Sequence, residues 1–389
     1  MLPTGVDDAL PFAYLDHAAS SPMRPEALSA LVEAQARITG NPSGSHRLAR
    51  EARRCLDDAR DVVAELVGAE PGEVVFTSGG TEADNLAVRG IVASAGGTAV
   101  CSAVEHHAVL DTVLAVGGRA VGVDSTGRID LDALGVELRR PGAVSLVSVM
   151  LANNETGVVN DLNEVAAVLA ESGTDAVLHS DAVAATAWLD LSKAASPASL
   201  VSISAHKVGG PKGVGVLVAR ANAALAPIIT GGGQERERRS GTPDVAGAVA
   251  FAAALSAAVA ERDALTVRIT AQADRLRSGL FSSIPGLVET VADVTPPERT
   301  PGTLHLCVPG VDREALLFLL DQHGVAASWG SSCASGASEP SHVLAAMGVA
   351  DDVARGSLRL SLGWSTIDDE IDHAVSVIPA AVAQLRRPT

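Results

Sequence analysis

The 389-residue sequence predicts an α/β protein with a large domain built on a mainly parallel, mixed sheet and a smaller C-terminal α/β domain. Two observations support this class. Short apolar runs alternate with helical patterns up to about Arg220, which is typical of parallel strands joined by helices. A long alanine-rich helical stretch, 246–282, then separates this region from a further α/β pattern. We expect a large domain at 16–255, a small domain at 256–389, and an N-terminal segment, 1–15, that packs with the small domain.

The elements follow in order along the chain. An amphipathic helix is expected first, and after it short strands that end in polar or glycine-rich turns. Residues 246–282 are expected to form more than one helix, and two loops are expected in the small domain. The predicted helix is 46–67, the strands are 73–76, 98–101, 144–150, 176–180 and 200–203, and the loops are 296–301 and 321–340.

Composition excludes several classes of protein. The net charge of −17 and the isoelectric point near 4.9 argue against general nucleic-acid binding, which needs a basic face. No run reaches the roughly 18 uncharged apolar residues of a membrane span, and residues 1–10 do not resemble a secretion signal. The four cysteines form no CxxC pair, so neither a disulfide framework nor a metal site is expected. We expect a cytoplasmic protein.

Lys207 follows the apolar run 200–203 and stands among glycines, beside Ser204 and His206. Lysine amines form Schiff bases with carbonyl compounds, and pyridoxal 5′-phosphate (PLP) is the usual aldehyde. A lysine after a strand is more often a solvated loop residue, so a second observation is needed.

Asp181 supplies that observation, because it ends the preceding apolar run, 26 residues before Lys207. A PLP enzyme needs a carboxylate opposite the pyridine nitrogen, which keeps that nitrogen protonated. Successive parallel strands would bring both residues to the carboxyl edge of the sheet, where α/β folds bind ligands. The alternative role of Asp181 is that of a helix N-cap.

A phosphate site is expected where residues 77–81 lead into a helix. Gly80 lets the backbone approach an anion, and Thr81 adds a hydroxyl. The amides at a helix N-terminus bind phosphate well. Most Gly-Gly-Thr turns are only turns, but this one precedes a helix and lies upstream of Lys207.

The ordered motifs of this chain resemble the cysteine desulfurases of the NifS/IscS type, within the PLP-dependent class V aminotransferase superfamily. The resemblance runs nearly end to end and implies the transferase fold type I. The matching segments are 14–19, 40–43, 77–82, 105–109, 152–157, 204–207, 231–236, 239–242, 332–336, 340–344 and 359–363. The segment around Cys333 resembles the branch that feeds iron–sulfur cluster assembly and tRNA thiolation.

The resemblance assigns a role to each candidate site residue. His106 would stack on the PLP ring and move protons, and Asn154 and Arg359 would bind the substrate carboxylate, with Asn154 near the cofactor. The phosphate would contact Ser204 and His206, and Thr242 of the other subunit, which implies a homodimer. The alternatives are a surface histidine, an Asn-Asn turn and a solvent-facing arginine.

Cys333 carries the identity of the reaction in this resemblance. Its thiolate would attack the sulfur of L-cysteine bound to PLP, leaving a persulfide and L-alanine. The persulfide would pass to a sulfur-acceptor protein such as an iron–sulfur scaffold or sulfur carrier. The other cysteines, Cys55, Cys101 and Cys307, lie in predicted helices or strands and are expected to be core residues.

Two positions depart from the family. Ala184 replaces a glutamine that bonds the phenolic oxygen of PLP in the family. Losing this bond would cost roughly 1.5–3 kcal/mol of cofactor interaction unless water or Asn154 supplies it. Trp329 is bulkier than expected before the Cys333 segment. A selenocysteine lyase or a specialised C–S lyase would share every cofactor residue, and an inactive scaffold is a third reading that the intact Lys207 and Cys333 oppose.

Overall fold

The computed structural model describes residues 12–220, 223–330 and 341–387. The chain divides into two compact units. The larger unit comprises residues 20–154 and 158–263, and the smaller comprises the described residues before 20, residues 155–157 and those from 264 onward. The division falls inside helix α8 (Val245–Ser283), a few residues beyond the boundary of 255/256 expected from the sequence.

The larger unit contains the alternating strands and helices that the sequence predicted. Its strands are β2 (Val74–Thr77), β3 (Thr98–Ser102), β4 (Arg119–Val121), β5 (Val144–Ser148), β6 (Val177–Asp181), β7 (Leu200–Ser204) and β8 (Gly215–Ala219). Its helices are α1 (Pro25–Arg37), α2 (Arg47–Val67), α3 (Gly80–Ala95), α4 (His107–Ala115), α5 (Leu131–Leu138), α6 (Leu162–Ser172) and α7 (Leu191–Ala194), with 3-10 turns η1 (Ala205–Val208) and η2 (Glu235–Glu237).

Within the described residues these strands form a seven-stranded sheet in the order β2-β8-β7-β6-β5-β3-β4. Neighbouring strands are parallel except at β8, which is antiparallel to both β2 and β7. The predicted mainly parallel, mixed sheet is therefore confirmed. The pairing that matters most for the site is β6 with β7, which sets Asp181 beside Ser202.

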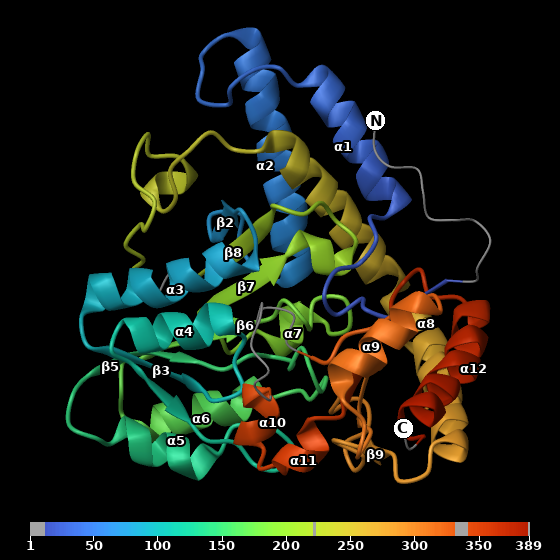
Figure 1. The fold of residues 1–389 in the computed structure, drawn as a ribbon. Coiled ribbons are helices and arrows are strands. Elements are labelled where there is room, and N and C mark those ends of the chain that lie inside the picture. Colours follow the sequence, from blue (N-terminus) through green and yellow to red (C-terminus); the bar gives the residue numbers. More distant parts are fainter. Residues whose placement is uncertain (1–11, 221–222, 331–340, 388–389) are drawn as a thin grey trace. The chain divides into compact units, whose positions relative to one another are not determined.

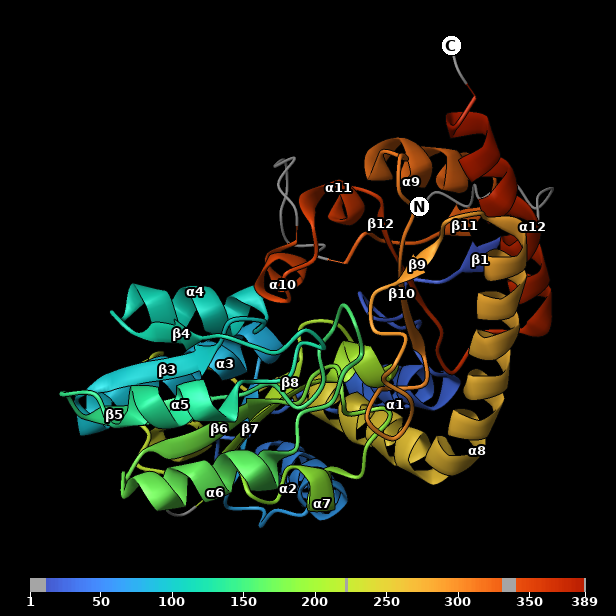
Figure 2. The same ribbon diagram turned by 90° about the horizontal axis from the view of Figure 1, so that it is seen from below.

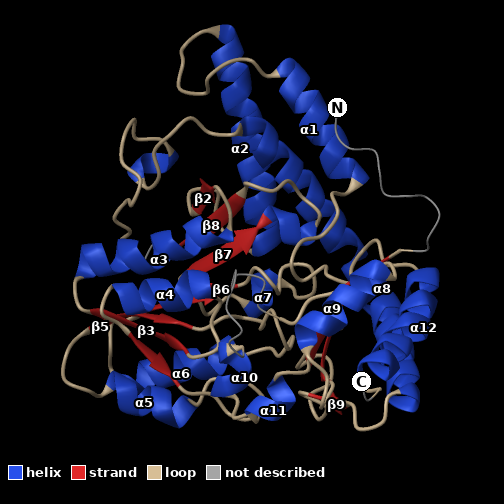
Figure 3. Cartoon of the chain, in the orientation of Figure 1, coloured by secondary structure: helices blue, strands red, loops and turns tan. Residues whose placement is uncertain are grey.

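Helices cover both faces of this sheet, as Figures 1 and 2 show for the larger unit, with the strands drawn in red at its centre in Figure 3. On one face, α3 and α4 pack on the strands around Leu86, Ile91 and Val113. On the other face, α2, α5, α6 and the first half of α8 form the larger cluster. Both faces of the strands are buried, which explains why they read as continuous apolar runs.

The smaller unit is a separate α/β body. It holds a three-stranded sheet, β12-β10-β9, and a two-stranded parallel pair, β1 with β11. Its strands are β1 (Ala13–Tyr14), β9 (Val288–Glu289), β10 (Thr303–Cys307), β11 (Val325–Ala326) and β12 (Ser357–Ser361). Its helices are α9 (Arg313–Gln322), α10 (His342–Ala346), α11 (Asp351–Ala354) and α12 (Asp368–Leu385).

Two sequence-based expectations need correction. Residues 246–282 form one continuous helix, α8, and not several. The stretch 321–340 is not wholly a turn region, because α9 ends at Gln322 and β11 pairs with β1. In both places the local pattern was weak and packing within the tertiary structure decided the outcome.

Helix α8 is long and apolar enough to cross a membrane by length and composition alone. However, 56% of its most apolar window is buried inside the protein. Core helices of globular proteins meet the same criterion, so the property is weak evidence for a membrane span.

Candidate active site

Lys207 lies in the short turn η1, directly after β7, and its side chain is half-buried. The backbone around it is held by Ser21. The Ser21 amide donates to the His206 carbonyl (3.0 Å), and the Ser21 hydroxyl donates to the Lys207 carbonyl (3.2 Å). The turn closes with Gly209 in the left-handed region (φ 80°). The lysine is thus presented from a fixed backbone rather than from a solvated loop.

Asp181 is the last residue of β6 and only 5% exposed. Its Oδ1 accepts a hydrogen bond from the Val183 amide (2.8 Å). Burial raises the pKa of this carboxyl to about 6, while the Val183 hydrogen bond and the Lys207 charge act in the opposite direction. Because Asp181 pairs with Ser202 on parallel β7, the two strands end at the same edge, as the sequence predicted.

The N-terminus of α3 begins at the same place. Its N-cap, Gly79, has a φ of 149°, and Gly80 follows as the first helical residue, before Thr81. A Cβ added at Gly80 would come within 2.8 Å of a Val183 methyl and 3.7 Å of the Ser204 Cβ. The start of α3 therefore packs closely on the segments that carry Asp181 and Lys207. Its free amides are oriented for an anion.

Ser204 and His206, the predicted phosphate contacts, lie on either side of the lysine in the chain. Ser204 is 1% exposed. His206 Nδ1 lies 3.2 Å from the Ser20 hydroxyl oxygen, and burial together with the charges of Lys207 and Lys212 lowers its pKa to about 4. His206 is therefore neutral at physiological pH and can donate one hydrogen bond to a phosphate.

His106 is the N-cap of α4, and its Nδ1 accepts a hydrogen bond from the Ala108 amide (3.1 Å). The neutral ring consequently carries its proton on Nε2. The neighbouring His107 forms an i,i+4 pair with Asp111 (3.2 Å).

The asparagine pair lies in the loop after β5. Asn153 is buried and donates to the Val104 carbonyl (3.1 Å), whereas Asn154 is half-buried in the turn that follows. Asn153 therefore anchors the loop from which Asn154 projects.

Thr242 is exposed and lines a small cavity of about 120 Å³ together with Thr77, Ser78 and Arg239. Arg239 is held by the carboxylate of Glu82 on α3 at 2.8 and 3.2 Å. The segment carrying Thr242 is thus attached to the N-terminal turn of α3.

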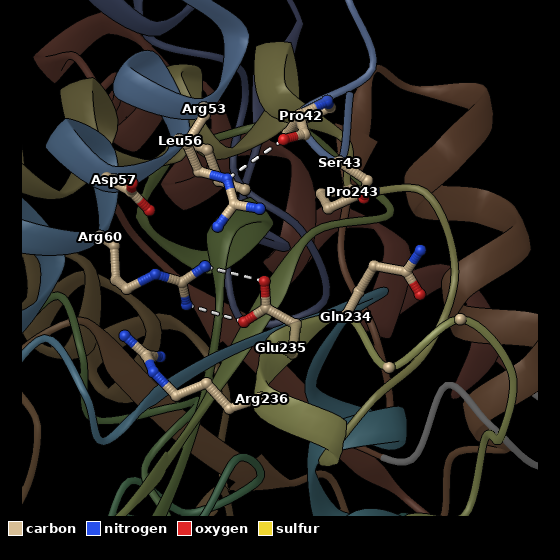
Figure 4. A pocket seen from close by; sticks show the side chains of 12 residues that line it. Pro42, Ser43, Arg53, Leu56, Asp57, Arg60, Gln234, Glu235, Arg236 and Pro243 are labelled. Atoms are coloured by element: carbon tan, nitrogen blue, oxygen red, sulfur yellow. Dashed lines mark hydrogen bonds and ion pairs between the residues drawn. The ribbon is translucent and has the colours of Figure 1, made fainter. Parts of the chain in front are cut away.

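A buried ion pair that the sequence analysis missed holds Glu235, seven residues before Thr242 (Figure 4). Arg60 of α2 donates two hydrogen bonds to Glu235, at 2.7 and 2.8 Å, and the Phe76 amide donates to the same carboxylate at 3.0 Å. Their side chains are only 6% and 4% exposed. Glu235, Arg236 and Glu237 all have positive φ (49°, 57° and 64°), a conformation unusual for residues other than glycine. The ion pair therefore stabilises a strained turn.

This turn borders a larger cavity of about 440 Å³. In Figure 4 the guanidinium groups of Arg53, Arg60 and Arg236 lie around it, with Asp57 on the same helix as Arg60. Burial and the neighbouring Arg60 lower the pKa of Arg236.

Arg359 and Trp329 belong to the smaller unit. Arg359, on β12, is 1% exposed, donates to Asp16 Oδ1 and to the Gly330 carbonyl (both 2.8 Å), and is therefore not the solvent-facing arginine of the alternative interpretation. The guanidinium of Arg313 lies 4.9 Å from the centre of the Trp329 ring. This contact gives the unusual tryptophan a packing role within its own unit.

The cysteines divide as expected where they can be seen. Cys101 in β3 and Cys307 in β10 are buried, and Cys55 in α2 is half-buried. Burial raises the pKa of both buried thiols. Cys333 lies outside the described residues.

A second missed feature is a polar row inside the sheet. His179, between the hydroxyls of Ser148 and Ser202, faces Asp84 of α3, and Glu105 is buried nearby. The polar residues inside otherwise apolar strands were the available signal, but their contact with α3 could not be read from the chain.

The comparisons with known proteins agree with this geometry. Residues 13–373 match the aminotransferase class-V family, so the chain belongs to that family, whose members are PLP-dependent. It is 43% identical over 387 residues to an IscS-like cysteine desulfurase from Mycobacterium tuberculosis, covering 96% of this chain and 97% of the relative. The recognised resemblance is thereby confirmed.

Solved structures show the same fold. A NifS-like protein aligns with a TM-score of 0.87 and 30% identity over 96% of this chain and all of its own. A structure of SspA in complex with cysteine aligns with a TM-score of 0.77 and 28% identity over 91% of this chain and all of its own.

The site fits the cofactor of the family. The Lys207 amine, the buried Asp181 carboxylate and the helix N-terminus at Gly80 are the three groups that an aldehyde-bearing pyridine phosphate needs. A Cβ at Gly80 would crowd Val183, so the glycine lets the start of α3 lie close to the segment that follows Asp181.

Proposed function

We propose that this chain is a PLP-dependent cysteine desulfurase, which removes sulfur from L-cysteine to give L-alanine and a persulfide on Cys333. The observation that carries the proposal is the convergence of Lys207, Asp181 and the start of α3 at one edge of the sheet. The names of the full-length relatives and the cysteine complex of SspA support the choice of substrate.

The side chains have separable tasks in this proposal. Bound PLP supplies an electron sink for the bonds around the substrate α-carbon. Lys207 would hold it covalently, Asp181 would face its ring nitrogen, and the amides of α3 with Ser204 and His206 would hold its phosphate. His106, whose Nδ1 accepts from the Ala108 amide, can stack on the ring and pass a proton through Nε2.

A carboxylate anchor and a nucleophile complete the assignment. Arg359 would bind the substrate carboxylate with its planar guanidinium, assisted by Asn154. The Cys333 thiolate would attack the substrate sulfur, so that an S–S bond forms as the C–S bond breaks and the carbon fragment is released as L-alanine.

The cofactor assignment is tested by trapping. The purified protein should be yellow, and borohydride should fix PLP on Lys207. The variant Lys207→Ala should lose trapping, whereas Lys212→Ala, an exposed lysine five residues away, should keep it. PLP fixed at another lysine would overturn the assignment.

The reaction is tested at the cysteines. Cys333→Ala should retain PLP but lose nearly all alanine and sulfide production, and Cys55→Ala should remain active. Mass spectrometry of the wild type should find added sulfur on Cys333. Assays with selenocysteine beside cysteine separate a desulfurase from a selenocysteine lyase.

We further propose a cytoplasmic homodimer in which Thr242 reaches the PLP phosphate of the other subunit, and a sulfur-acceptor protein as partner. The exposure of Thr242 supports this arrangement. Mixing Lys207→Ala subunits with Thr242→Ala subunits tests whether Thr242 acts on the PLP of the other subunit or on that of its own chain. If Thr242 acts in trans, mixed dimers regain one intact site, and if it acts within its own chain, they regain none.

A further inference from the structure

Asp84 is a carboxyl group buried behind the proposed cofactor site. It lies in the second turn of α3 and is 1% exposed. Among the described residues no lysine or arginine forms an ion pair with it, and Oδ1 has no hydrogen-bond partner. The nitrogen that approaches it is His179 Nε2, at 3.6 Å.

A hydrogen-bonded row joins Asp84 to the centre of the sheet. His179 Nδ1 lies 2.8 Å from the Ser148 hydroxyl oxygen, and Nε2 lies 3.0 Å from the Ser202 hydroxyl oxygen. The Ser202 hydroxyl also acts on the Asp84 carboxyl, whose pKa it lowers. The row thus crosses β5, β6 and β7, and its His179 Nε2 faces Asp84 Oδ1 of α3 at 3.6 Å.

Asp181 belongs to the same surface. His179 and Asp181 are two residues apart on β6, so their side chains point to the same face of the sheet, the face that α3 covers. Ser202, the partner of Asp181 in the β6–β7 register, is the residue whose hydroxyl contacts His179 Nε2. The charge of Asp181 also raises the pKa of Asp84, so the two carboxyls act on each other.

The row has two proton arrangements. If Asp84 is ionised, His179 Nε2–H donates to the Ser202 hydroxyl oxygen, and Nδ1 accepts from Ser148. If Asp84 is protonated, the Ser202 hydroxyl donates to Nε2, and Nδ1–H donates to Ser148. Both arrangements satisfy the 3.0 and 2.8 Å contacts of His179, so the total charge decides between them.

The surroundings favour the neutral arrangement. The acids that face Asp84 are Asp181 and Glu105, both buried, and the cation on this side is Lys207, which acts on Asp181. Burial first, then the charges of Asp181 and Glu105, raise the pKa of Asp84 well above its usual range, and the Ser202 hydrogen bond only partly opposes this. His179 has its pKa lowered to about 3 by burial, so it does not supply a positive charge.

We propose that Asp84 is a positioning residue, held as a neutral acid by the Ser202–His179–Ser148 row, that leaves Asp181 as the negatively charged partner of the cofactor ring nitrogen. The second half of this inference rests on the proposed function. The first half concerns the protein without any cofactor and can be tested separately.

The first test uses cofactor-free protein and infrared spectroscopy at neutral pH. A protonated carboxyl has its own C=O stretching band, and Asp84→Asn should remove one such band. Asp61→Asn, an exposed aspartate on α2, should remove none. Glu105 can contribute a second band, which stays in both variants, so the difference spectrum isolates Asp84. An unchanged protonated-carboxyl region in Asp84→Asn would overturn the proposal.

A second variant keeps the proposal testable if Asp84→Asn does not fold. Ser202→Ala keeps the Asp84 carboxyl but removes the hydroxyl that acts on it, so the band should move to higher frequency rather than disappear. A band that does not move would show that Asp84 is not joined to the row.

The last test concerns the loaded protein. If Asp84 is neutral at neutral pH, as proposed, raising the pH should ionise it beside Asp181 and change the cofactor absorbance of the wild type. Asp84→Asn should lose that transition while keeping the neutral-pH spectrum. A transition of equal size in both proteins would overturn the link to Asp181. Failure of PLP to bind at all would instead contradict the proposed function and leave the infrared result standing.

Discussion

The substitution Glu235→Gln breaks the buried ion pair with Arg60 while keeping the shape of the side chain. The glutamate accepts three hydrogen bonds, at 2.7, 2.8 and 3.0 Å, from Arg60 and the Phe76 amide. Glutamine has one acceptor oxygen, and its amide group would face a donor. The Arg60 cation would keep at most one hydrogen bond to the glutamine, together with its Val74 carbonyl contact (2.7 Å) and its position over the Phe76 ring.

The magnitude follows from this count. Removing one member of a buried ion pair leaves an uncompensated charge and costs about 3–5 kcal/mol. The left-handed turn at Glu235–Glu237 is stabilised by the same pair, and each such residue stores about 1–3 kcal/mol of strain. We therefore expect the cost to lie in the upper part of the 3–5 kcal/mol range.

The assay is urea unfolding of cofactor-free protein followed by circular dichroism. An exposed pair on α1, Arg37 with Glu33 at 2.6 Å and 66% and 64% exposed, provides the matched control. Arg37→Met should change the unfolding free energy by at most about 0.5 kcal/mol. Combining Glu235→Gln with Arg60→Met removes the orphaned cation, and should recover about 2 kcal/mol relative to the sum of the single changes.

Two results would refute the reasoning. Glu235→Gln could prove no more costly than the exposed control, or the double variant could show simple additivity. Either would mean that the turn is held by its backbone contacts and that the buried charges do not depend on each other.

Three further predictions concern the site. Ala184→Gln should tighten PLP by about ten- to a hundredfold, the equivalent of roughly 1.5–3 kcal/mol, by adding a donor near Asp181. An unchanged dissociation constant would show that the position is already compensated. Gly80→Ala should weaken PLP binding because its methyl would meet Val183 at 2.8 Å, and Val183→Ala in the same chain should restore it. Cys101 and Cys307, whose thiol pKa values are raised by burial, should resist iodoacetamide at neutral pH until the protein is unfolded. Mass spectrometry that finds either cysteine alkylated in the native protein would contradict this.

The order of elements could be predicted because it depends on local patterns. The helix at 47–67 begins at a histidine whose ring caps the Ala49 amide, and it ends at Gly68 in the left-handed region. Asp181 and Lys207 each follow an apolar run, and parallel strands bring their ends together. These signals are contained in short stretches of sequence.

The features that were missed depend on contacts between distant residues. Glu235–Glu237 contains no glycine, so nothing in the sequence signals its left-handed turn, and the turn exists because Arg60, 175 residues earlier, binds it. The antiparallel direction of β8 likewise follows from packing rather than from local propensity, and so does the formation of one helix, α8, over Val245–Ser283.

The sequence by itself determined the fold class, the family and the residue types of the site, because these are written in periodicity and in motifs a few residues long. Only the tertiary structure decided which polar groups are buried together. Asp84 reads as an ordinary helix residue, and it becomes a buried acid because α3 turns that face toward His179 on β6. Its protonation depends on desolvation and on the charges of residues far along the chain, neither of which is a property of any segment alone.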